Sequence, residues 1–223
     1  MLANYENIQA HEIVVETIDS VTITFLLDTA IKNEYPLLLI GPTGTGKTIY
    51  TMKYLKSLNS KLFQLIFVGF SAQTTAGQTQ SIVDNKIKKQ RKGYYGPPFG
   101  MKCVVFIDDL NMPEYDRYGS QPPIELIRQF LDQGGWYDHK DRIIKNIIDT
   151  TLIGAMGPPG GGRKIISQRL LSYFNVVACL ENEQGTLNRI FTIMMSAYAL
   201  KHKYPEQLNK TLQNSVKALV HVY

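Results

Sequence analysis

The sequence predicts an α/β protein in which a parallel β-sheet lies between layers of helices. Short apolar runs, such as 36–40 and 102–107, alternate along the chain with segments whose pattern is helical. A wholly apolar run is typical of a strand buried on both faces, and strands that alternate with helices favour a parallel sheet. A glycine-rich turn at 41–48 joins the first of these strands to a helix, as such folds often do.

Five apolar runs are predicted as the strands of the sheet. They are rich in Val, Ile, Leu, Phe and Ala, and polar, Gly or Pro residues bound them. Their ranges are 36–40, 61–70, 102–107, 150–156 and 175–180.

The segments between the strands are predicted as helices and loops. Helices are expected over 21–33, 49–58, 71–90, 122–135 and 166–174, and from Gln184 to the C-terminus with one break at Pro205. The helix at 122–135 has Pro at its start and Gly past its end, which is the usual asymmetry. The segment 91–100 is rich in Gly and Pro and is predicted as a hairpin or loop, and 157–163 as a loop.

Composition and charge favour a cytoplasmic protein without a nucleic-acid-binding surface. The 223 residues carry a formal net charge of +5, and the densest basic stretch is 86–96. A solvated helix end is favoured there over a nucleic-acid or acidic-protein contact. Cys103 and Cys179 lie in apolar runs, as buried reduced thiols of a cytoplasmic protein do.

Other classes are excluded by what the sequence lacks. The four histidines show no metal-ligand spacing, and the N-terminus has no secretory-signal pattern. No apolar run approaches the ~20 residues that span a bilayer. We expect neither nucleic acid nor a membrane as a partner.

The glycine-rich turn is a complete phosphate-binding motif. Its spacing is G-x-x-x-x-G-K-[ST], and it follows a predicted strand and opens a helix. Glycines let backbone N–H groups surround phosphate oxygens, and the helix N-terminus adds positive potential. Lys47 is predicted to reach the β- and γ-phosphates and Thr48 to ligate Mg²⁺. The predicted nucleotide-binding residues of this segment are Gly41, Pro42, Thr43, Gly44, Thr45, Gly46, Lys47, Thr48 and Ile49.

A pair of aspartates supplies the second half of the predicted site. Asp108 and Asp109 end the apolar run 102–107. Asp108 is expected to hold Mg²⁺ with Thr48, and Asp109 to orient and polarise a water. The alternative is a strand that simply ends in polar residues. Asn111 follows in the loop, where it either bonds a phosphate or caps a turn.

These motifs and several longer stretches resemble the third AAA+ module of dynein heavy chains, of the axonemal type. The resemblance covers most of the chain, from about Val15 to Phe191. The stretches that carry it are "PLLLIGPTGTGKT", "GFSAQTTAGQTQ", "KGYYGPPFGMKCVVFIDDLNMP", "YGSQPPIELIRQFLDQGGWYD" and "GAMGPPGGGR".

The resemblance implies a P-loop AAA+ large subdomain with three αβα layers, a five-stranded parallel sheet and a helical lid. Residues 1–20 are then a lead-in segment near adenine, 21–181 the large subdomain and 182–223 the start of a truncated lid. Segment 91–100 is a loop inserted in the second helix, and the stretch from Gly134 to Ile148 is an insert before the sensor strand. We expect the chain to be a fragment of a heavy chain.

Roles for four further residues follow from the resemblance. Val15 and Thr17 match the segment that packs on adenine, with an ordinary core strand or turn as the alternative. Arg169 matches an arginine directed at the nucleotide of the neighbouring module, with an ordinary surface arginine as the alternative. Arg163 is a weaker candidate for the same role.

Two departures from the family pattern favour holding ATP over hydrolysing it. Met156 and Gly157 stand where related modules carry a polar sensor residue, and Asp109 stands where many carry glutamate. Both changes weaken activation of water and leave phosphate binding intact. The alternatives are a competent ATPase that uses Asp109, and a structural ring module with a vestigial P-loop.

The resemblance also implies a setting. The expected cofactors are ATP or ADP with Mg²⁺. The expected partners are the adjacent AAA+ modules and, through the full motor, dynein light and intermediate chains and microtubules. The expected location is the cytoplasm and its cytoskeleton, in the axoneme of a cilium or flagellum.

Overall fold

The centre of the protein is a five-stranded sheet whose paired strands all run parallel. The computed structural model describes residues 13–138, 142–202, 204 and 208–222. The strands are β1 (Leu37–Ile40), β2 (Phe63–Gly69), β5 (Lys102–Asp108), β8 (Thr150–Met156) and β9 (Asn175–Ala178). Their order across the sheet is β2-β5-β8-β1-β9. The predicted parallel five-stranded sheet and its α/β fold class are confirmed.

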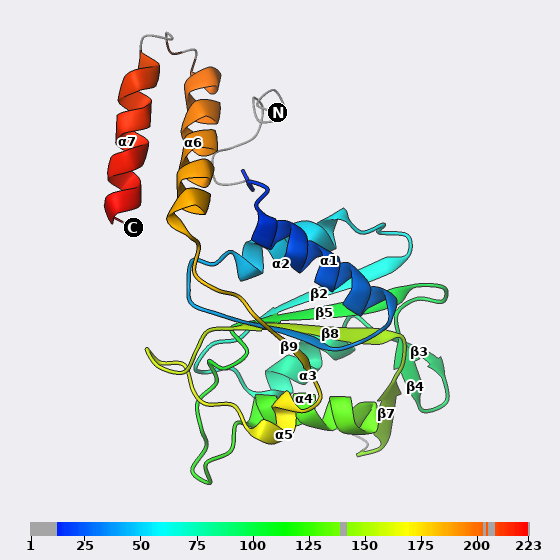
Figure 1. Ribbon diagram of the computed structural model, residues 1–223. Helices are drawn as coiled ribbons and strands as arrows, with labels where there is room; N and C mark the ends of the chain where they lie inside the picture. The colour runs from blue at the N-terminus through cyan, green and yellow to red at the C-terminus, as the bar shows by residue number, and fades with distance from the viewer. Residues whose placement is uncertain (1–12, 139–141, 203, 205–207, 223) are drawn as a thin grey trace. The chain divides into compact units, whose positions relative to one another are not determined.

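Helices cover both faces of this sheet (Figure 1). Helices α1 (Ile18–Lys32) and α2 (Lys47–Ser57) lie on one face, and α3 (Ala76–Asp84), α4 (Pro122–Gln133) and α5 (Gln168–Leu171) lie on the other. Five successive residues of β5 are buried, as a strand covered on both faces requires. Helix α4 packs Ile124, Ile127 and Phe130 into the same core. Burial of each such side chain contributes about 1.5–3 kcal/mol.

The helix predicted over 71–90 is shorter than expected. It begins after Thr75, whose side chain forms a capping box with Gln78, and it ends at Asp84. Residues Lys88–Arg91 form strand β3, which pairs antiparallel with β4 (Tyr94–Gly96). The prediction of a helix end in this basic stretch is therefore wrong. A turn with Gly93 at φ 79° and the packing of Arg91 on the Tyr94 ring, 4.0 Å from its centroid, favour the hairpin over a helix.

A second, mixed sheet joins two segments that the sequence presents separately. Its order is β3-β4-β7-β6, with β6 at Gly135–Tyr137 and β7 at Ile144–Ile147. Lys145 of β7 donates to Asp84 at 2.9 Å and also pairs with Asp138. The Trp136 indole donates to the same Asp84 carboxylate at 3.1 Å. These contacts attach the small sheet to the end of α3.

The remaining helices are α6 (Gln184–Lys201) and α7 (Asn209–Val222), which pack against each other. The predicted break at Pro205 lies outside the described residues. The chain divides into two compact units, Thr22–Leu180 and the segments on either side of it. None of the helices described has the length and apolar character of a membrane span.

Candidate functional site

The glycine-rich turn leaves the carboxyl end of β1 and enters helix α2. Its first residue is tightly enclosed: the Gly41 N–H donates to the Met156 carbonyl at 3.2 Å, and a Cβ at Gly41 would lie 2.2 Å from the Cys179 carbonyl oxygen. Gly44 and Gly46 have φ of 85° and 81°, the left-handed conformation that favours glycine. The turn therefore needs glycine for reasons of space and of backbone conformation.

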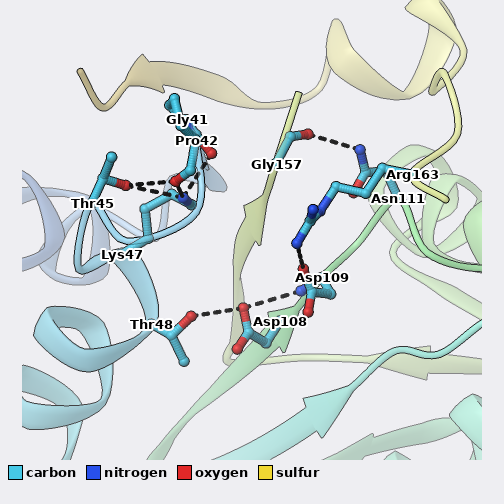
Figure 2. Close-up of polar contacts among 10 residues, drawn as sticks. All are labelled: Gly41, Pro42, Thr45, Lys47, Thr48, Asp108, Asp109, Asn111, Gly157 and Arg163. Atoms are coloured by element: carbon cyan, nitrogen blue, oxygen red, sulfur yellow. Dashed lines mark hydrogen bonds and ion pairs between the residues drawn. The ribbon is translucent and has the colours of Figure 1, made fainter. Parts of the chain in front are cut away.

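The Lys47 side chain folds back over this turn (Figure 2). Its Nζ donates to the carbonyl oxygens of Gly41 at 2.7 Å and Pro42 at 2.5 Å, and to Thr45 Oγ1 at 3.0 Å. Burial lowers the pKa of Lys47, and the nearby charge of Arg163 acts in the same direction. Asp108 and Asp109 act in the opposite direction. An anion beside Lys47 would offset the cost of burying its charge.

Thr48 and Asp108 face each other across the sheet edge. Thr48 Oγ1 donates to Asp108 Oδ1 at 3.0 Å, and the Asp109 N–H donates to the same oxygen at 3.0 Å. A hydroxyl and a carboxylate are oxygen ligands of the kind that Mg²⁺ binds, usually together with phosphate oxygens and water. No group of three or more His, Cys, Asp or Glu side chains that could hold a metal ion is found among the described residues. The pair fits a nucleotide-bound Mg²⁺ better than a metal held by protein alone.

Asp109 lies just beyond the end of β5 in a left-handed conformation, with φ of 52°. This conformation costs free energy for a non-glycine residue, although aspartate adopts it more readily than most, and such residues cluster at functional sites. Its side chain is 44% exposed and pairs with Arg163, whose Nη2 lies 3.3 Å from Asp109 Oδ1. The carboxylate that was predicted to act on water is thus bound to an arginine of the same chain.

Strand β8 separates the glycine-rich turn from the aspartates. Met156 ends this strand opposite Ile40 of β1, and the buried Asn111 donates its amide to the Gly157 carbonyl at 2.8 Å. Of the two roles considered for Asn111, this contact is closer to the structural one. Sequence reasoning missed the Arg163 contact with Asp109, because 54 residues separate the two in the chain.

The structure describes each of the other predicted residues in its own element. Ile49, in the first turn of α2, is 56% exposed, and Thr43 is also exposed. Val15 and Thr17 are buried, and Thr17 caps helix α1 through reciprocal hydrogen bonds with Ser20 of 2.9 and 3.1 Å. Arg169 lies on α5 and is exposed. The nucleotide and neighbour contacts proposed for these residues stay predictions.

Comparisons with known proteins identify one family. The model of the family described as "P-loop containing dynein motor region" matches residues 3–182. The chain is 44% identical over 213 residues to dynein axonemal heavy chain 12 of Mus musculus. This match covers 95% of the chain and 7% of the relative. It is 47% identical over 188 residues to dynein axonemal heavy chain 1 of Rattus norvegicus, covering 83% of this chain and 4% of the relative. The chain therefore spans less than a tenth of these relatives.

Proposed function

The chain belongs to the family of P-loop-containing dynein motor regions, and on this premise we propose that it is an ATP-binding AAA+ module of a dynein heavy chain. One observation carries the proposal: the glycine-rich turn after β1 and Asp108 at the end of β5 meet at one sheet edge, where Thr48 Oγ1 lies 3.0 Å from Asp108 Oδ1. Ligands of parallel α/β sheets bind at the carboxyl ends of the strands.

Each residue of this edge has a role in the proposal. The backbone of Gly41–Thr48 and the Lys47 ammonium hold the phosphates of ATP or ADP, while Thr48 and Asp108 hold Mg²⁺. Bound Mg²⁺ neutralises phosphate charge. Val15, Thr17 and Ile49 are proposed to lie toward the base.

We propose that the chain is the third AAA+ module of an axonemal dynein, where its nucleotide state regulates a microtubule-based motor for the movement of cilia or flagella. The absence of a polar side chain at Met156–Gly157 and the short Asp109 favour slow hydrolysis. Adjacent AAA+ modules are the direct partners, with Arg169 as the candidate arginine for a neighbour's nucleotide. Light and intermediate chains and microtubules act through the full motor. The proposed domain bounds are 1–20, 21–181 and 182–223.

Titration of the purified chain with Mg·ATP and Mg·ADP tests the nucleotide site. Loss of the Lys47 charge in Lys47→Ala is expected to weaken both by roughly 10-fold to 100-fold, the value of one charge-assisted hydrogen bond. Lys56→Ala is the matched control, because Lys56 is an exposed lysine in the last turn of the same helix. Unchanged affinity in Lys47→Ala would overturn the site.

A second candidate function is a competent ATPase in which Asp109 positions the attacking water. The half-exposed Asp109 carboxylate beside Asp108 favours it. Water would attack the γ-phosphorus, and ADP and phosphate would leave. This candidate predicts phosphate release once the neighbouring module's arginine is supplied, and loss of that release in Asp109→Asn. A structural module with a vestigial P-loop predicts no nucleotide binding at all.

A further inference from the structure

The end of strand β8 lacks a polar side chain, yet a cation of the same chain reaches this place. Arg163, in the loop between β8 and α5, extends over Gly157 toward Asp109 (Figure 2). A Cβ at Gly157 would lie 2.5 Å from Arg163 Nε, so glycine at this position makes room for the guanidinium. The Arg163 guanidinium therefore lies over Gly157, at the place where related modules are expected to carry a polar sensor side chain.

The backbone that carries Arg163 is fixed, although three glycines precede it. Gly160 and Arg163 exchange two backbone hydrogen bonds of 3.0 Å, and the next residue, Lys164, donates its N–H to the Asn111 carbonyl at 2.9 Å. Gly160, Gly161 and Gly162 all have positive φ, which lets the loop close this tightly. Any movement of the guanidinium is therefore limited to rotation of the Arg163 side chain about its own bonds.

The contact between Arg163 and Asp109 is weak for an ion pair. Its single N–O distance of 3.3 Å exceeds the ~2.7–2.9 Å of charge-assisted hydrogen bonds, and the Asp109 side chain is 44% exposed. Arg163 Nε and Asn111 Oδ1 are buried and have no hydrogen-bond partner among the described residues. A buried N–H without a partner costs free energy, so this arrangement leaves the guanidinium able to gain from an anion.

We infer that Arg163 is the residue through which this module distinguishes ATP from ADP: its guanidinium leaves Asp109 and binds the γ-phosphate. This inference rests on the proposed nucleotide site. Burial is the main cause of the lowered pKa of Lys47, and the charge of Arg163 adds to it, so the two cations lie within electrostatic range of each other. A cation on each side of the end of β8, Lys47 at the turn and Arg163 beside Asp109, would match the charge of a terminal phosphate bound between them. Departure of Arg163 would also free the Asp109 carboxylate.

The test compares the affinities of the whole chain for a non-hydrolysable Mg·ATP analogue and for Mg·ADP. Arg163→Ala is expected to weaken the analogue by roughly 10-fold to 100-fold and to leave ADP unchanged. Lys164→Ala removes the same charge from the neighbouring residue, which faces Glu114 at 3.6 Å, and is expected to change neither. Gly157→Ala, which crowds the guanidinium, is expected to resemble Arg163→Ala.

A double-mutant cycle with Asp109→Asn tests the exchange itself. Asp109→Asn releases Arg163, so affinity for the analogue should rise, and the rise should shrink or vanish in the Arg163→Ala background. Equal effects of Arg163→Ala on the analogue and on ADP, or no effect on either, would overturn the inference and leave the nucleotide site standing. If the wild-type chain binds neither nucleotide, the proposed function fails as well. If Arg163→Ala does not fold, Gly157→Ala takes its place, both in the comparison of the analogue with ADP and as the second background of the cycle with Asp109→Asn.

Discussion

Gly41 shows how one residue fixes the start of the phosphate-binding turn. Its Cα lies against the Cys179 carbonyl, and an added Cβ would approach that oxygen to 2.2 Å. Gly41→Ala should therefore shift the backbone of the turn and lower the free energy of unfolding by about 1–3 kcal/mol. Urea denaturation measures the change. Gly69→Ala, at the end of β2 with open space around it, is the control and should cost much less.

The lowered pKa of Lys47 makes a prediction about pH. Burial disfavours the charged ammonium in the free protein, so its pKa lies below the ordinary lysine value of 10.5. A bound phosphate favours the charged form and raises the pKa again, so binding takes up a proton between the two pKa values. Nucleotide affinity should therefore fall as pH rises through the lower pKa, and calorimetry over neutral to alkaline pH measures it. Lys47→Arg stays protonated and should lose this fall, and a fall that persists in Lys47→Arg would assign the proton to another group.

At the scale of elements, the small second sheet depends on a nearly buried ion cluster. Lys145 is 16% exposed and pairs with Asp84 and Asp138, whose side chains are 20% and 19% exposed. Lys145→Ala leaves two carboxylates without their cation, and we expect a loss of about 1–3 kcal/mol in the free energy of unfolding. Lys102→Ala breaks an exposed pair with Glu34 at 2.7 Å and should cost at most ~1 kcal/mol. Equal costs for the two variants in urea denaturation would contradict this account of the sheet.

The elements differ in how far the sequence predicts them. The strands of the large sheet are apolar runs with clear ends, and the glycine-rich turn is a local pattern, so both are readable without a structure. The sequence predicts the strand pair Lys88–Arg91 and Tyr94–Gly96 only in part, because β3 has four exposed polar residues and no apolar period. Strand β4 also pairs with β7, about 50 residues further along the chain, and a local sequence pattern does not predict pairing at that distance.

At the scale of the whole molecule, the candidate site also combines residues that local sequence patterns predict with contacts that they do not predict. Thr48 and Asp108 each end or begin a readable element, so their meeting at one sheet edge follows from a parallel sheet. The contacts of Arg163 with Asp109 and of Asn111 with Gly157 depend on loops that cross this edge, and no local spacing predicts them. The strands therefore form the edge of the sheet at which the candidate site lies, and the loops supply the contacts of Arg163 and Asn111 at that edge.

The central claim is that the chain forms a nucleotide site that holds ATP. The most direct test is calorimetric titration of the whole chain with Mg·ATP and with Mg·ADP, followed by analysis of the nucleotide recovered. We expect both nucleotides to bind and the recovered ATP to be intact. Absence of binding would contradict the site at Gly41–Thr48 and Asp108, and steady release of ADP would contradict its assignment as a module that holds ATP.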